Sequence, residues 1–328
     1  MEDFPCNLAE FERRFATQEA CRDYLVHLRW PEGFRCPRCG GGKFWPQRVI
    51  LLHCAACDYQ SSVTAGTIFQ DTHAPLTLWF RAMWYITSQK NGTSALGLQR
   101  ILGLGSYRTA WAWLHKLRRA MVRPGRDRLH GHVEVDETFV GGEEDGVSGR
   151  RRGDKSLIVV AVELEGKKVG RIRLRSIPDA SAESLHAFIK DAIEPGSIVH
   201  SDGWQGYKGL EQKGYPCEVT VIGKQRKNAV KLLPHVHLVI ALLKRWLLGT
   251  HQGAVNGAYL AYYLDEFTFR FNRRKSKSRG KLFYRLVQQA VTTAPAPYDQ
   301  LVIRPPTETP AQPQAVGATL GYMSKVHT

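Results

Sequence analysis

Hydrophobic residues recur at helical spacing in the first third of the chain. A period near 3.6 puts such residues on one face of a helix. We therefore expect helices in residues 1–30 (two short ones), 75–90 and 93–122 (two, separated by a glycine turn). Ser106 follows that turn and is a good N-cap for the last helix. The intervening residues 31–66 are rich in glycine and cysteine, which predicts a small β module.

From residue 131 the pattern changes to that of strands. Three segments of alternating or continuously apolar residues follow one another, HVEVDETFV, SLIVVAVEL and KVGRIRLRSI. A helix capped at Ser181 should come next, then a buried strand in GSIVHSD and a further strand in CEVTVI. Two more helices are expected, in PHVHLVIALLKRWLLG and VNGAYLAYYLDEFTFRFNRR. Three antiparallel strands, a helix and a fourth strand beside the first make up a ribonuclease-H-like α/β core.

Composition narrows the class of protein. A chain of 328 residues is long enough for two or three domains. Its net charge of +16 indicates a polyanionic partner, most often nucleic acid. No secretory signal is visible, and the apolar runs are too short to span a bilayer. We expect a cytoplasmic protein, at the nucleoid if the source is bacterial or archaeal, with no membrane partner.

Four cysteines have the spacing of a metal site. Cys36 and Cys39 form one C-x2-C pair, and Cys54 and Cys57 form a second pair after fourteen intervening residues. Two such pairs supply four thiolates for a closed, structural Zn²⁺ site. The alternative, four unrelated buried cysteines, is disfavoured by the doubled spacing. The module is expected to bind DNA or a protein partner, and the spacing does not distinguish the two.

The helix pair in residues 93–122 resembles a helix-turn-helix. Its second helix carries several basic residues, among them Arg108 and Lys116, which predicts contact with DNA. The alternative is an ordinary hairpin of two helices, since Trp111 and Trp113 look like core residues.

Two aspartates come at the ends of predicted strands. Asp136 ends the first strand of the run, and Asp202 ends the strand after the helix. In the expected core these carboxylates meet at one end of the sheet, where they repel each other unless a cation lies between them. Oxygen ligands of this kind suit Mg²⁺ or Mn²⁺ and phosphoryl transfer. Glu134 shares a face with Asp136 and is expected to support the site, whereas Glu137 points the other way and is expected at the surface. Taken singly, each aspartate is better read as a turn residue at the end of a strand.

Two basic or polar segments complete the chain. Residues 270–281 hold seven basic residues in twelve, preceded by phenylalanines. We expect an anchored arm along the DNA backbone, contacted by Arg273, Arg274 and Lys275; the alternative is a solvated charged face. Residues 292–328 are rich in proline and polar residues and are expected to be a disordered tail.

Taken together, the motifs resemble those of a known family. They are CPRCG, CDYQSSVTAGTIFQDTHAPLTLWF, GSYRTAWAWLHKLRRAM, VEVDETFVGG, VHSDGWQGY, LKRWLLGTHQG and YLDEFTFRFNRR. From about residue 8 to 290 the chain is similar to the DDE-type insertion-sequence transposases with an N-terminal zinc ribbon, insertion-sequence family fifteen ninety-five. This resemblance implies metal-dependent DNA strand cleavage and transfer, with Asp136 and Asp202 as the first two catalytic acids.

The resemblance also indicates a third catalytic position. In the family it lies seven residues before a lysine, which matches His237 and Lys244, and many relatives have glutamate there. Seven residues are about two helical turns, so both side chains share a face. Lys244 is expected to contact phosphate. Glu266 is the rival third residue, but its aromatic neighbours are typical of a packed helix.

The expected protein is therefore a multidomain α+β chain. Its parts are N-terminal helices (1–30), a zinc ribbon (31–66), a helical helix-turn-helix region (75–124), a ribonuclease-H-like α/β catalytic domain (130–290) and the tail (292–328). The expected partners are terminal inverted repeats and target DNA. A homodimer or higher synaptic assembly is expected because two element ends must be paired. The alternatives are an inactive DNA-binding protein derived from such a transposase, and a related nuclease without strand transfer.

Overall fold

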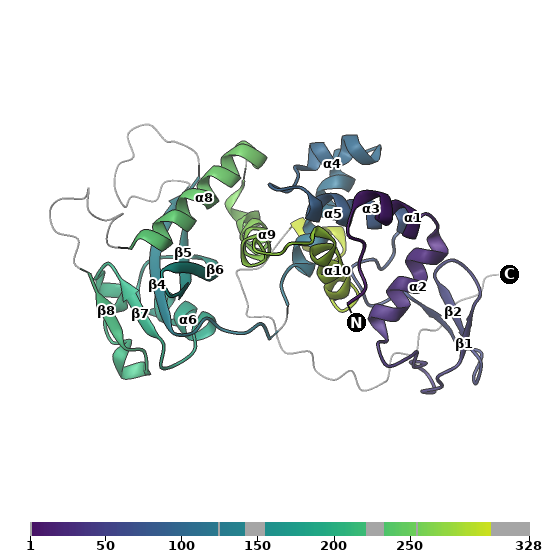
Figure 1. Cartoon of the computed structure of the whole chain (residues 1–328), viewed down its shortest axis with the longest axis horizontal. Coiled ribbons are helices and arrows are strands. Elements are labelled where there is room, and N and C mark those ends of the chain that lie inside the picture. The colour runs from purple at the N-terminus through teal and green to yellow at the C-terminus, as the bar shows by residue number, and fades with distance from the viewer. Residues whose placement is uncertain (1, 124, 142–154, 221–232, 254, 303–328) are drawn as a thin grey trace.

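The computed structural model describes residues 2–123, 125–141, 155–220, 233–253 and 255–302. Two lobes are visible, one built on a five-stranded sheet and one built of helices that carry a small three-stranded sheet (Figure 1). None of the described helices is long and apolar enough to cross a membrane.

The small β module expected in residues 31–66 is present. Strands β1 (Phe44–Pro46), β2 (Leu51–Cys54) and β3 (Gln60–Ser62) form an antiparallel sheet in that order. Its small core contains Phe34 and Leu52. Arg29 fixes the module to the helical lobe by donating to the carbonyls of Ser62 and Val63, at 3.2 and 2.7 Å.

One hydrophobic core unites the helices of the helical lobe. They are α1 (Leu8–Arg14), α2 (Gln18–Arg29), α3 (Leu76–Ser88), α4 (Ala95–Leu102), α5 (Tyr107–Ala120) and α10 (Arg279–Ala290). Ser106 caps α5 as expected, accepting from the N–H of Arg108 at 3.1 Å. The helices of residues 1–30 and 75–124 therefore form one unit.

Helix α10 corrects the expected end of the catalytic domain. The sequence assigned residues up to 290 to that domain, yet α10 packs against α3 of the helical lobe. Phe283 is fully buried there, with its ring centroid 5.4 Å from that of Phe11 and 5.7 Å from that of Phe80. The C-terminal chain thus returns to the N-terminal lobe because an apolar face of α10 completes its core.

The large sheet has the expected strands. They are β4 (His132–Val140), β5 (Ser156–Glu165), β6 (Lys168–Ile177), β7 (Ile198–Ser201) and β8 (Cys217–Val219), in the order β6-β5-β4-β7-β8. Pairings among β4, β5 and β6 are antiparallel, whereas β4–β7 and β7–β8 are parallel. The connection from β6 through α6 (Ala182–Ala192) to β7 gives the ribonuclease-H-like arrangement.

Helices cover both faces of this sheet. Helix α6 packs on one face through Leu185, Phe188 and Ile189. Helices α8 (Pro234–His251) and α9 (Leu260–Asn272) pack on the other face (Figure 1). Double coverage explains the continuously apolar run in β5, whose central residues are all buried.

Helix α9 joins the two lobes. Tyr263, Phe267 and Phe271 contribute to the core under the sheet, whereas Phe269 belongs to the core of the helical lobe. Aromatic residues at several angular positions of one helix are typical of a helix that is buried on most sides.

The prediction of a disordered tail is wrong for its first residues. Helix α11 (Tyr298–Val302) is formed, Leu301 and Ala296 are buried, and the Tyr259 hydroxyl donates to the Val302 carbonyl at 2.9 Å. Composition alone suggested disorder, but these apolar side chains find a surface to pack on. Residues 303–328 of the expected tail lie outside the described part of the chain.

Candidate active site and zinc centre

The pairing of β4 with β7 brings the two predicted aspartates to the same place. Glu134 is the partner of His200 in this parallel ladder. Continuing the register by two residues puts Asp136 beside Asp202, with adjacent strands about 4.8 Å apart. Asp202 follows the last residue of β7, and its Oδ1 accepts from the N–H of Trp204 at 3.0 Å. Gly203 permits this turn, because its φ of 79° lies in the left-handed region.

Glu137 does not lie at the surface, so that prediction is wrong. It is half-buried, and one of its carboxylate oxygens is fully covered. Burial, together with the charges of Asp136 and Asp202, raises the pKa of Glu137 to about 7. Alternation along β4 does turn Glu137 away from Asp136, but that face of the sheet is covered as well. A third acid therefore borders the site.

His237 approaches Asp136 from helix α8. Its Nδ1 lies 3.6 Å from Oδ2 of Asp136, and its side chain is 24% exposed. The other ring nitrogen, Nε2, is buried and has no hydrogen-bond partner among the described residues. An imidazole in this position has one nitrogen turned to the acid and one available to a ligand or substrate.

Lys244 lies on the same side of α8 as His237. Burial lowers the pKa of its ammonium group, the negative charge of Asp136 raises it, and Lys155 lowers it. Asp136 therefore acts on both residues of the predicted pair, as their spacing of seven residues requires.

Glu134 supports the site by holding α8. It is 2% exposed. Its carboxylate accepts from the backbone N–H groups of His235 and Val236, at 2.9 and 2.8 Å, and from Nδ1 of His235 at 2.7 Å.

Glu266, the rival for the third position, lies elsewhere. Its side chain is fully buried in α9 and accepts from Arg118 and Arg270, each at 2.8 Å. These arginines hold the pKa of Glu266 below its usual value despite its burial. Arg118 on α5 is itself only 2% exposed. Glu266 is thus an ion-pair partner that ties α9 to the helical lobe.

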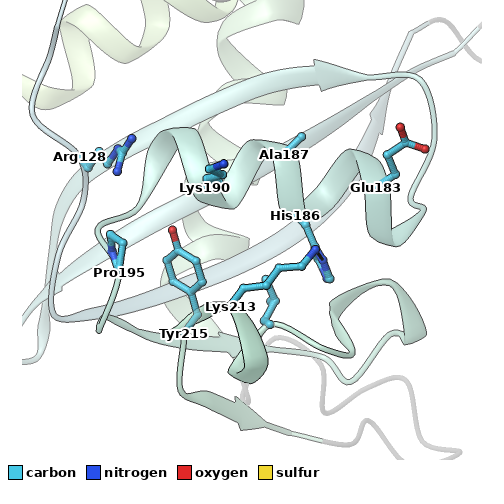
Figure 2. A pocket seen from close by; sticks show the side chains of 9 residues that line it. Arg128, Glu183, His186, Ala187, Lys190, Pro195, Lys213 and Tyr215 are labelled. Carbon is cyan, nitrogen blue, oxygen red and sulfur yellow. Dashed lines mark hydrogen bonds between the residues drawn. The ribbon is translucent and has the colours of Figure 1, made fainter.

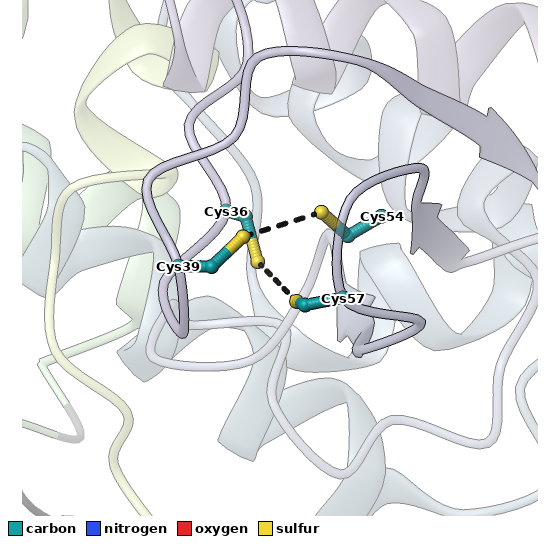
Figure 3. Close-up of side chains that lie close together, drawn as sticks. All are labelled: Cys36, Cys39, Cys54 and Cys57. Atoms are coloured by element: carbon teal, nitrogen blue, oxygen red, sulfur yellow. Dashed lines mark hydrogen bonds between the residues drawn. The ribbon is translucent and has the colours of Figure 1, made fainter.

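The four predicted cysteines come together at one point (Figure 3). Their sulfur atoms all lie within 4.8 Å of one another. Sγ of Cys36 is 3.7 Å from that of Cys57, and Sγ of Cys39 is 3.6 Å from that of Cys54. Tetrahedral Zn–S bonds of about 2.3 Å require sulfur atoms about 3.8 Å apart, so the cysteines fit a structural zinc ion.

Both C-x2-C turns have the same backbone form. The N–H of Gly40 donates to the Cys36 carbonyl at 2.9 Å, and the N–H of Asp58 donates to the Cys54 carbonyl at 3.1 Å. Gly40 and Asp58 both have positive φ, 73° and 57°. This repeat turns each pair of thiols toward the same centre.

Family models match both parts of the chain. The ISXO2-like transposase domain matches residues 128–272, and the transposase zinc-ribbon domain matches residues 16–60. Both models describe the IS1595 group of insertion sequences. The chain belongs to the IS1595-family transposases. An uncharacterized protein in transposable element ISH50 of Halobacterium salinarum is 27% identical over 279 residues, which are 79% of this chain and 92% of that protein.

The solved structures that resemble this transposase share less sequence with it than the ISH50 protein does. The Mos1 transposase paired-end complex with left transposon end is 14% identical, with a TM-score of 0.30 over 68% of this chain and 77% of the other. The simian T-cell lymphotropic virus intasome in complex with PP2A regulatory subunit B56 gamma is 14% identical, with a TM-score of 0.29 over 67% and 76%.

Two residues of the transposase that are predicted to contact DNA lie on α5, and their side chains are only partly free to reach a DNA backbone. Arg108 is exposed, but its guanidinium lies 3.9 Å from the ring centroid of Tyr298. Lys116 is half-buried, and burial lowers its pKa. Contact with DNA by this helix stays a prediction.

The basic segment after α9 is not a free arm at residues 273–275. The Arg273 guanidinium stacks on Phe269, and Arg274 donates to the backbone carbonyls of Gly170 and Val169 in β6. Lys275 pairs with Glu165 at 2.5 Å. The sequence could not indicate these contacts, because the partners in β5 and β6 lie more than a hundred residues away.

A cavity of about 520 Å³ lies beside α6, away from the aspartates. Arg128, Lys190 and Lys213 line it, and Lys213 Nζ lies 2.6 Å from His186 Nδ1 (Figure 2). Arg128 precedes β4, so the cavity opens where the strand begins, whereas Asp136 lies further along it. None of the predicted catalytic residues lines this cavity.

Proposed function

We propose that this transposase catalyses metal-dependent strand cleavage and strand transfer at the ends of an insertion sequence. The observation that carries the proposal is the parallel pairing of β4 with β7, whose register, continued two residues beyond Glu134 and His200, puts Asp136 beside Asp202. His237 adds a third polar group at 3.6 Å from Asp136. Three such groups on rigid elements are typical of a site that handles phosphate and metal.

The donor set fits a divalent cation. Two neighbouring carboxylates supply hard oxygen ligands. Burial and, after it, the negative charges of these carboxylates raise the pKa of Glu137 to about 7. Asp136 and Asp202 would hold the ion, with His237 as a further ligand or as a hydrogen-bond donor to the scissile phosphate. Mg²⁺ or Mn²⁺ at these residues would stabilise the charge that develops on the attacked phosphate.

The site needs small movements to surround an ion. Among the described residues, the four cysteines form a group of ligand atoms within 4.8 Å, and the two aspartates with His237 do not. Rotation about aspartate and histidine side-chain torsions covers such differences without moving the backbone. We infer that the acids are drawn together when metal binds.

The remaining groups of the site act on DNA. Lys244, near Asp136, would contact a phosphate beside the cut. The chain's net charge of +16 supports binding to DNA, meaning the terminal inverted repeats and the target. Two element ends have to be paired for transfer, so we propose a homodimer or higher assembly on DNA.

The test is a cleavage and joining assay. Full-length, zinc-loaded protein is incubated with end-labelled duplexes carrying the element's terminal repeat, a plasmid target, and Mg²⁺ or Mn²⁺. We expect nicks at the repeat boundary and labelled joint products, both lost in EDTA. Cleavage without joining would identify a nuclease, and binding with no cleavage in either metal would contradict the enzymatic proposal.

A second candidate is a DNA-binding protein without catalysis. The resemblance to the family favours it, because that resemblance implies glutamate in many relatives at the position of His237. The same assay separates the two, because a chain without catalysis would bind the terminal-repeat duplex and leave it uncut in Mg²⁺ and in Mn²⁺.

A further inference from the structure

Glu134 meets the hydrogen-bonding requirement of the first turn of α8. A helix leaves its first N–H groups without partners inside the helix. In α8 the first residue, Pro234, has no N–H, and the preceding Leu233 offers no side-chain cap. The N–H of His237 donates to the Leu233 carbonyl at 3.2 Å. The N–H groups of the next two residues, His235 and Val236, both donate to Oε2 of Glu134.

This cap comes from the strand that bears the metal-binding acid. Side chains two residues apart on a strand point to the same face, so Glu134 and Asp136 both face α8. On the helix, His237 directly follows the capped Val236. The contacts of Glu134 are all between 2.7 and 2.9 Å. They therefore fix the position of the first turn of α8 against β4 and the rotation of α8 about its own axis.

The geometry assigns to Glu134 the role of a positioning residue for His237. Its hydrogen bonds go to the first turn of α8, so it acts on the site through the helix. It fixes the separation between His237 and Asp136, and it orients Lys244 two turns further along the same helix. This inference rests on the proposed function, and it gives Glu134 a role other than binding the metal.

The first test compares two buried glutamates by kinetics. Glu134→Gln keeps the size of the side chain but removes its negative charge. The charge-assisted bonds from the two backbone N–H groups, which share Oε2, and from His235 Nδ1, at Oε1, therefore become weaker neutral ones. We expect kcat for strand cleavage to fall about tenfold or more, with KM for the terminal-repeat duplex within about twofold.

Glu163→Gln is the matched control. Glu163 is 4% exposed, lies opposite Val133 in the neighbouring strand and accepts from Arg171 and from the N–H of His130. It should lose thermal stability to a similar degree while kcat stays at the wild-type value. Equal losses of kcat in both variants would show a general effect of disturbing the sheet and would overturn the assignment.

The second test asks whether Glu134 acts through His237. In a His237→Ala background, Glu134→Gln should reduce kcat no further, since the group it positions is gone. Fully additive losses would overturn the assignment.

Hydrogen exchange gives a readout without catalysis. Backbone amides of residues 235–240 should exchange faster in Glu134→Gln than in Glu163→Gln, both measured in metal-free catalytic sites on the zinc-loaded chain. If the wild type does not cleave DNA, the proposed function fails. The exchange comparison still shows whether Glu134 caps the first turn of α8. Equal exchange in the two variants would show that Glu134 does not hold α8.

Discussion

His237 Nδ1 lies 3.6 Å from Asp136 Oδ2, which joins the helix α8 to the strand that carries the first acid. A neutral imidazole is a weak ligand for Mg²⁺ and a better one for Mn²⁺. We predict that His237→Ala lowers the cleavage rate at least tenfold, that His237→Glu retains part of it, and that the wild type works faster in Mn²⁺. Single-turnover rates in the two metals check this, and a wild-type rate in His237→Ala would remove His237 from the site.

Glu266 should matter for stability rather than for chemistry. Its carboxylate is fully buried between Arg118 and Arg270, so Glu266→Gln leaves buried positive charge without its partner. Breaking a buried pair in this way typically costs about 3–5 kcal/mol. Urea unfolding should show such a loss, while cleavage at low temperature persists. A stable but inactive Glu266→Gln would make Glu266 the third catalytic residue.

The zinc site should stabilise the ribbon by itself. Purified protein is predicted to contain about one Zn²⁺ per chain, and Cys39→Ser should lose it because a closed structural site needs all four thiolates. Elemental analysis measures the metal, and limited proteolysis should show cleavage within residues 31–66 while the large sheet stays protected. Protein purified without chelators and free of zinc would contradict this.

We predict that protonation of His251 lowers the free energy of unfolding in mild acid. Its ring packs against Trp246 and Tyr263, and burial together with Arg118 lowers its pKa from 6.5 to about 4. The folded protein therefore binds this proton less readily than the unfolded chain does. Stability from this group is complete above pH 6.5 and is lost as the pH falls toward 4, by roughly 2 kcal/mol at pH 4.5.

Replacing His251 with a neutral residue isolates that contribution. Between pH 7 and 4.5, His251→Gln should lose about 2 kcal/mol less unfolding free energy than the wild type. Identical pH slopes in urea titrations of the two proteins would show that His251 is protonated without cost in the fold.

The sequence predicted the strands that carry the two aspartates better than it predicted the side-chain contacts around them. Strand patterns and strand order were enough to bring Asp136 and Asp202 together, because parallel neighbours align the ends that carry them. The sequence indicated that Glu134 supports the site and that Glu266 lies in a packed helix, but it could not name Val236 or Arg118 as their partners, because these lie 102 and 148 residues away.

Glu137 shows a different limit. Alternation placed it correctly on the face opposite Asp136, but that face was read as solvent-exposed. The continuously apolar run in β5 was the available signal that both faces of the sheet are covered. Helix α10 was missed because its apolar face completes a core formed by residues near the other end of the chain.

The most direct test of the proposed site is strand cleavage by Asp136→Asn and Asp202→Asn. Each change keeps the size of the side chain and removes one negative charge. With labelled terminal-repeat duplex and Mg²⁺ or Mn²⁺, both variants should show no cleavage above background while binding the duplex as tightly as the wild type or slightly more tightly. Cleavage at the wild-type rate by both variants would contradict the assignment of the active site.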